Sequence, residues 1–231
     1  RQLALSTFRQ RRGAERGDRS VADGMVDLPF VVPTRPEDAL AAEEAGADAV
    51  GFVFAAGSKR QVSPELAADL SAVLGPFVAR IGVFLNASQA DIENAVRTAG
   101  LTAVQLHGDE DAGFARQLAA TLGGTIKVIR AVSFGSEVTP ASLADYPADA
   151  ILLDASVPGS GQTFQWQAAA AWRQHPRMVL AGGLNPDNVA TAVAALEPFG
   201  VDVSSGVETG PGIKNADLIS RFVAAARGAT G

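Results

Sequence analysis

Apolar runs and helical patterns alternate along this chain from residue 28 to its end. Each apolar run is short and continuous, which is typical of parallel strands buried on both faces of a sheet. The runs predicted to form strands cover residues 28–32, 47–54, 78–85, 101–106, 125–131, 149–153, 178–181 and 201–204. The segments predicted to form helices cover residues 36–45, 64–74, 89 onward, 112–122, 140–146, 166–173, 186–196 and 216–226.

Eight strand–helix units in about 200 residues indicate an α/β fold of the (β/α)₈ TIM-barrel type. A doubly wound sheet usually has fewer strands, and no Gly-x-Gly-x-x-Gly motif follows the first predicted strand. Helix-start signals support the pattern: Pro36 opens one helix, Ser63 is placed as an N-cap, and Ser88 and Asp91 have capping-box spacing. We therefore predict a single barrel domain over residues 25–231.

The amino-acid composition argues against several classes of protein. Hydrophobic residues make up 47% of the chain and charged residues 19%, which excludes intrinsic disorder, and no apolar run is long enough to cross a membrane. The chain has no cysteine and only two histidines, His107 and His175, so we expect neither a disulfide scaffold nor a metal site. The net charge of −6 argues against nucleic acid as the main partner.

Residues 1–24 differ from the rest of the chain in charge. They hold six arginines against three acidic residues, although the whole chain is acidic. The segment lacks the apolar stretch of a secretory signal, so we expect a cytoplasmic protein. We interpret the segment as a disordered extension or a non-authentic leader, with Met25 as the candidate start.

The functional face of a (β/α)₈ barrel lies at the carboxyl ends of its strands. Gly182 and Gly183 follow the seventh predicted strand, and Gly206 follows the eighth. Glycines at these two neighbouring ends allow backbone N–H groups to approach a phosphate. They could instead serve only tight turns, but their position on strands 7 and 8 favours a phosphorylated ligand.

Three side chains at the same face are candidates for chemistry or binding. Asp154 directly follows the sixth apolar run and could act as a general acid, or it could be a structural carboxylate. Arg60 could bind a ligand carboxylate or phosphate with its planar guanidinium, although a solvated arginine is the default interpretation. For His107 a structural role is more common than a catalytic one.

These residues lie in motifs that resemble the phosphoribosylanthranilate isomerase family of tryptophan biosynthesis. The matching segments are 34–39, 46–54, 58–64, 82–84, 105–108, 152–154, 180–186 and 201–208, among them Gln-Leu-His-Gly at 105–108 and Val-Asp-Val-Ser-Ser-Gly-Val-Glu at 201–208. The resemblance implies a barrel that converts N-(5-phosphoribosyl)anthranilate to a 1-deoxyribulose phosphate by an Amadori rearrangement. It also implies no cofactor, no metal, a phosphosugar as the partner, and a monomer or homodimer.

The resemblance further assigns roles to individual residues. Asp154 matches the family's general acid, which protonates the furanose ring oxygen, and Arg60 matches the residue that faces the anthranilate carboxylate. The substrate-binding residues that it implies are Arg60, Gln105, Gly182, Gly183, Ser205 and Gly206.

One position departs from the family. The family's base is a cysteine at the end of the first strand, and Val31 stands there in this chain, followed by Pro33. Valine cannot accept a proton, so three explanations compete: a barrel that only binds a phosphorylated sugar, an enzyme that recruits another base, or a non-authentic start. A phosphoribosyl-sugar isomerase of histidine synthesis would need a carboxylate on this strand, and none is present.

Overall fold

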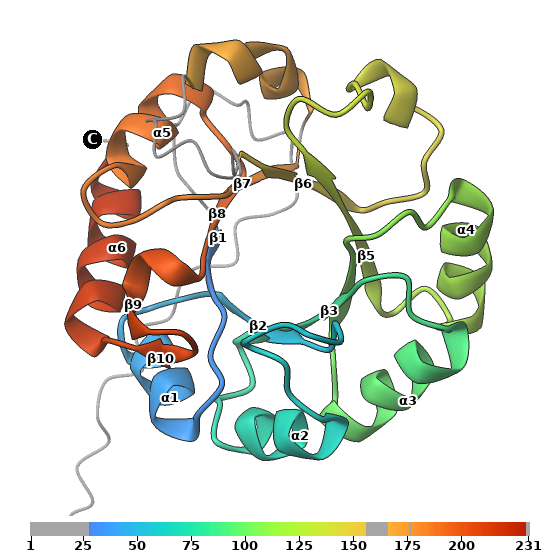
Figure 1. Cartoon of the computed structure of the whole chain (residues 1–231), viewed down its shortest axis with the longest axis horizontal. Helices are drawn as coiled ribbons and strands as arrows, with labels where there is room; N and C mark the ends of the chain where they lie inside the picture. Colours follow the sequence, from blue (N-terminus) through green and yellow to red (C-terminus); the bar gives the residue numbers. More distant parts are fainter. Residues whose placement is uncertain (1–27, 156–165, 176, 230–231) are drawn as a thin grey trace, which may run out of the picture.

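The main sheet closes on itself because the first strand pairs with the last. The computed structural model describes residues 28–155, 166–175 and 177–229. β1 (Leu28–Val31) pairs in parallel with both β2 (Ala49–Val53) and β8 (Gly200–Val203). The strands that complete the ring in chain order (Figure 1) are β3 (Ala79–Phe84), β4 (Ala103–Leu106), β5 (Lys127–Ser133), β6 (Ala150–Asp154) and β7 (Met178–Ala181). The predicted (β/α)₈ barrel is confirmed, whereas the leader 1–24 lies outside the described residues.

Helices surround the ring of strands (Figure 1). The α-helices are α1 (Pro36–Glu44), α2 (Pro64–Ala72), α3 (Gln89–Ala99), α4 (Ala112–Thr121), α5 (Val189–Leu196) and α6 (Ala216–Gly228). The helical segments predicted after β5 and β6 are the 3₁₀-helices η2 (Ala141–Leu143) and η3 (Trp166–Gln174). None of the helices in the described ranges is long and apolar enough to cross a membrane.

Side-chain hydrogen bonds explain where several helices begin. The hydroxyl oxygens of Ser63 and Ser88 accept the backbone N–H of Leu66 and Asp91, as expected of N-caps. At the start of η2, the side-chain oxygens of Thr139 and Ser142 each accept the backbone N–H of the other residue, a local alternative to helical bonding.

The structure differs from the sequence prediction at two places near the carboxyl ends of β7 and β8. α5 starts three residues later than predicted, because Asn185 and Asn188 form a turn in which each side-chain oxygen accepts backbone N–H groups of the turn. After β8, η4 (Ser205–Val207) leads into a small antiparallel sheet of β9 (Glu208–Gly210) and β10 (Ile213–Lys214).

The hydrophobic core has two layers, separated by the barrel wall. One cluster fills the barrel interior and is formed by the inward side chains Phe30, Val32, Ala49, Ile81, Ala103, Ala131, Leu152, Val179 and Ala181. The other, larger cluster joins the outward strand residues to the helices. Successive residues of each strand therefore contribute to different clusters, as the alternation of side chains along a strand requires.

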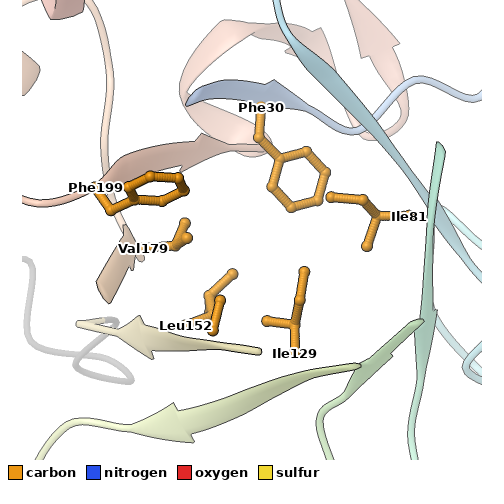
Figure 2. Close-up of a pocket in the computed structure, with 7 residues that line it drawn as sticks. Phe30, Ile81, Ile129, Leu152, Val179 and Phe199 are labelled. Carbon is orange, nitrogen blue, oxygen red and sulfur yellow. The ribbon is translucent and has the colours of Figure 1, made fainter. Parts of the chain in front are cut away.

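A cavity of about 80 Å³ lies inside the barrel. Phe30, Ile81, Ile129, Leu152, Val179 and Phe199 point toward one another around it (Figure 2). Ala150, the first residue of β6, also lines the cavity, and Phe199 directly precedes β8. The cavity is thus at the amino ends of the strands and has a purely hydrophobic lining, so it offers no group for catalysis.

Truncating a large side chain that lines this cavity should lower the unfolding free energy, because it enlarges a void that is already present. Leu152 is 1% exposed and is expected to lose about 2–5 kcal/mol of unfolding free energy in Leu152→Ala. Leu85→Ala, at a residue that is 51% exposed, is the matched control and should change stability by less than about 0.5 kcal/mol. Urea unfolding of both variants measures the difference; equal losses would contradict this description of the core.

Candidate active site at the barrel mouth

Asp154 lies at the carboxyl end of β6, at the mouth of the barrel. Leu152 belongs to the interior cluster and Leu153 to the outer one, so the side chain of Asp154 faces the interior. The structure brings it to the end of β4, where His107 Nε2 lies 3.8 Å from Asp154 Oδ2. The position of the predicted general acid at the functional face therefore agrees with the sequence analysis.

His107 is held by Gln105, which is almost completely buried at the same end of β4. Gln105 Nε2 lies 3.0 Å from His107 Nδ1. An amide nitrogen can only donate, so Nδ1 accepts and the ring hydrogen of neutral His107 is on Nε2, toward Asp154. Burial lowers the pKa of His107 and outweighs the opposing effects of Asp154 and Glu110, so the ring is neutral at pH 7.

Arg60, in the loop after β2, forms a bidentate ion pair with Glu208 at the start of β9. Its Nε and Nη2 atoms each donate to a carboxylate oxygen at 2.7 Å. Lys214, whose side chain is fully buried, donates to the same carboxylate at 2.8 Å and to the Ser204 carbonyl oxygen. Arg60 was expected to face a ligand carboxylate; two of its five N–H groups are instead used within the protein.

This cluster of Arg60, Glu208 and Lys214 joins the β2 loop to the region after β8. Glu208 is removed from solvent, which by itself raises its pKa, but its hydrogen bonds to both cations lower the pKa to about 2. The carboxylate is therefore ionised throughout the physiological range, and the cluster as a whole carries one positive charge.

The two glycine loops pack directly against each other. Gly182 and Gly183 have φ angles of +90° and +67°, which residues with a side chain rarely adopt. A Cβ atom on Gly206 would lie 1.8 Å from the carbonyl oxygen of Leu184, so the loop after β8 needs glycine there for backbone packing. Tight turns and close contact thus account for these glycines, and the loops after β7 and β8 lie side by side.

Val31 does not face the barrel interior. It is completely buried in the outer cluster, whereas Phe30 and Val32, on either side of it, belong to the interior cluster. At the position where the family's base was expected, the valine side chain thus packs toward the helices and offers no proton acceptor. The inward residues of this segment are apolar, so β1 offers no proton acceptor.

The structure adds a carboxyl that the sequence analysis did not single out. Asp202 lies on β8 between Val201 and Val203, which both face the helices, so its own side chain faces the barrel interior. Its Oδ1 is buried and accepts no hydrogen bond among the described residues. Desolvation and the nearby charge of Asp154 raise the pKa of Asp202 to about 7, against the opposing effects of Lys214 and Arg60.

A polar residue between two apolar residues in a buried strand was the available signal for Asp202. Glu208 gave no such signal, because its partner Arg60 lies 148 residues away in the sequence. Among the described residues, no group of three His, Asp or Glu side chains is arranged to hold a metal ion.

Comparison with known proteins identifies the class and then the family. The closed barrel, with acidic groups and glycine loops at the carboxyl ends of its strands, is that of a (β/α)₈-barrel enzyme. The family model for N-(5'-phosphoribosyl)anthranilate isomerase matches residues 30–225. The chain belongs to the phosphoribosylanthranilate isomerase family.

Individual relatives match over nearly their whole length. The chain is 46% identical to the N-(5'-phosphoribosyl)anthranilate isomerase of Thermotoga neapolitana, covering 88% of this chain and all of the relative. The crystal structure of the Thermotoga maritima isomerase superimposes with a TM-score of 0.77 at 42% identity, covering 87% of this chain and 98% of that one. This chain also resembles a phosphoribosyl anthranilate isomerase that was crystallised in complex with reduced 1-(o-carboxyphenylamino)-1-deoxyribulose 5-phosphate. That structure superimposes with a TM-score of 0.76 at 41% identity, covering 87% of this chain and 98% of that one.

The raised pKa of Asp202 predicts an unusual pH dependence of stability. A carboxyl with a pKa of about 7 in the native state and 3.8 when unfolded keeps its proton longer in the native state. The unfolding free energy should therefore fall as the pH rises from about 4 to about 7, by an amount on the order of 2–4 kcal/mol. Urea unfolding at pH 5 and pH 8 should show this loss in the wild-type chain.

Asp202→Asn should lose much less stability over the same interval, because its amide does not titrate. Asp69→Asn, on the exposed face of α2, is the control and should keep the wild-type pH dependence. If the wild-type chain and Asp202→Asn had the same pH dependence, the assignment of the titrating group would be wrong.

Proposed function

We propose that this chain catalyses the Amadori rearrangement of N-(5-phosphoribosyl)anthranilate to 1-(2-carboxyphenylamino)-1-deoxyribulose 5-phosphate, a step of tryptophan biosynthesis. Family membership over residues 30–225 supports the reaction. The observation that carries it to this chain's own residues is the position of Asp154, which faces the interior at the carboxyl end of β6. The reaction needs proton transfers only, and side chains can supply these without a cofactor.

Asp154 acts as the general acid in this proposal. It protonates the furanose ring oxygen, the bond from that oxygen to C1 breaks, and the nitrogen lone pair forms the open-chain Schiff base. His107 lies 3.8 Å away and, with its hydrogen on Nε2, can orient the Asp154 carboxyl without competing for the same proton. A positioned acid typically contributes about 10²–10⁴-fold to the rate.

The two ends of the substrate have matching binding groups. The phosphate lies on the backbone of the paired glycine loops, at Gly182, Gly183, Ser205 and Gly206, in the position where barrels commonly bind phosphate. At the other end, Arg60 keeps three N–H groups beyond its ion pair with Glu208 and can use them for the anthranilate carboxylate. The positive charge of the Arg60 cluster favours binding of an anion.

One observation favours a second candidate function. The inward side chains at β1 are apolar, so this strand contains no group that could take the C2 proton. A barrel without any base would bind the phosphosugar and its product without converting them. The two functions differ in turnover and share the binding site.

Replacing the acid should separate catalysis from binding. Asp154→Asn keeps the shape of the side chain but cannot deliver the proton, so turnover should fall at least about 100-fold. Affinity for the reduced product, measured by calorimetry, should stay within about threefold. Turnover is followed by the loss of fluorescence of the anthranilate group, with Asp69→Asn as the control; an Asp154→Asn variant with full activity would exclude Asp154 as the acid.

The phosphate site needs a variant that leaves the backbone packing intact. Gly206 is unsuitable, because any side chain there meets the carbonyl oxygen of Leu184. Ser205 is exposed, so Ser205→Glu should fold normally and repel the phosphate, weakening product binding at least about tenfold. Thr209→Glu adds the same charge at an exposed position on β9 and should weaken binding less. Equal effects of the two variants would contradict the proposed phosphate position.

A further inference from the structure

The isomerisation requires a proton acceptor for C2, and the structure limits the candidates at the barrel mouth. Glu110 accepts hydrogen bonds from the backbone N–H groups of Asn86 and Gly108 and from Arg130, so both its oxygens are used. Glu208 is likewise held by Arg60 and Lys214. The oxygens of these two carboxylates are thus occupied by hydrogen bonds within the protein.

His107 is also a poor acceptor in this arrangement. Its Nδ1 is engaged by Gln105, and its Nε2 carries the ring hydrogen. Neither nitrogen therefore offers a lone pair to the substrate.

Asp202 differs from these groups in one respect. Its side chain faces the barrel interior, and its Oδ1 has no hydrogen-bond partner among the described residues. Oδ1 is buried, but the residue as a whole remains partly accessible. A buried carboxylate oxygen without a donor is costly and needs an explanation, of which a catalytic role is one.

We propose that the Asp202 carboxylate accepts the C2 proton of the open-chain substrate and so replaces a base on β1. The inference rests on the proposed isomerase function and assigns the second of its two proton transfers. Asp154 and Asp202 come from β6 and β8, with β7 between them (Figure 1), and the charge of one influences the other. When two carboxyls repel each other in this way, the state in which only one of them carries a proton is favoured, and an acid–base pair needs such a singly protonated state.

The proton balance closes with these two groups alone. After Asp154 has protonated the ring oxygen, Asp202 takes the proton from C2. The C2–H electron pair forms the C1=C2 double bond, and the C1=N electrons return to nitrogen, which gives the enolamine. When the enol becomes the ketone, C1 gains a proton from Asp202 and the O2 hydroxyl loses one to Asp154. Both carboxyls return to their starting states, and no further reactant is needed.

The surroundings of Asp202 suit a base near neutral pH. The neighbouring strands β7 and β1 contribute no titratable side chain within Met178–Ala181 and Leu28–Val31. The charged groups that act on Asp202 are Asp154, which raises its pKa, and Lys214 and Arg60, which lower it. With a pKa of about 7, Asp202 is ionised in about half of the molecules at pH 7, and its carboxylate is more basic than that of an ordinary aspartate.

The test compares the wild-type chain with Asp202→Asn, Asp154→Asn and the surface control Asp69→Asn. Asp202→Asn should lower kcat about 10²–10⁴-fold while KM and product affinity stay within about threefold. In the wild-type chain, kcat/KM should fall as the pH drops below about 7, because the base becomes protonated. Circular dichroism and urea unfolding establish that each variant is folded.

The possible outcomes separate this inference from the proposed function. A wild-type chain that binds the product but does not isomerise the substrate overturns both. Wild-type turnover that is lost in Asp154→Asn but kept in Asp202→Asn supports the function and overturns the role of Asp202. If Asp202→Asn fails to fold, the wild-type pH profile still decides: activity that is constant from pH 6 to pH 8 overturns the inference.

Discussion

The pairing of β1 with β8 is the constraint on which the rest of the structure depends. Once the ring is closed, each strand residue must face either the interior or the helices. Phe30 pairs with Asp202, and Val31 pairs with Val203, in the register of this closure. One constraint therefore directs Val31 toward the helices and the carboxyl of Asp202 toward the interior.

The barrel interior is divided between stability and chemistry. Its amino end is filled by aromatic and aliphatic side chains around a small hydrophobic cavity (Figure 2). At the carboxyl end, Gln105, Asp154 and Asp202 take the inward positions. Each of these polar groups has a desolvation cost, which the protein tolerates because the hydrophobic layer beneath it stabilises the fold.

The cluster of Arg60, Glu208 and Lys214 connects structure to electrostatics. It attaches the loop after β2 to the small β9–β10 sheet, and its net positive charge faces the region of Asp202. Without these cations the pKa of Asp202 would be higher still, because burial and Asp154 act in the same direction. The cluster thus favours the binding of an anion, and it limits the rise in the pKa of Asp202.

Much of this description follows from the order of residues. The continuous apolar runs, the helix caps at Ser63 and Ser88, and the position of Asp154 after its strand are local features, and local features can be read from a sequence. The direction of Val31 depends on the register between β1 and β8. The bidentate pairing of Arg60 with Glu208, the contact of Gly206 with Leu184, and the raised pKa of Asp202 all join residues that are distant along the chain. Such contacts exist only after the barrel has closed, because it is closure that removes these groups from water and places them within reach of one another.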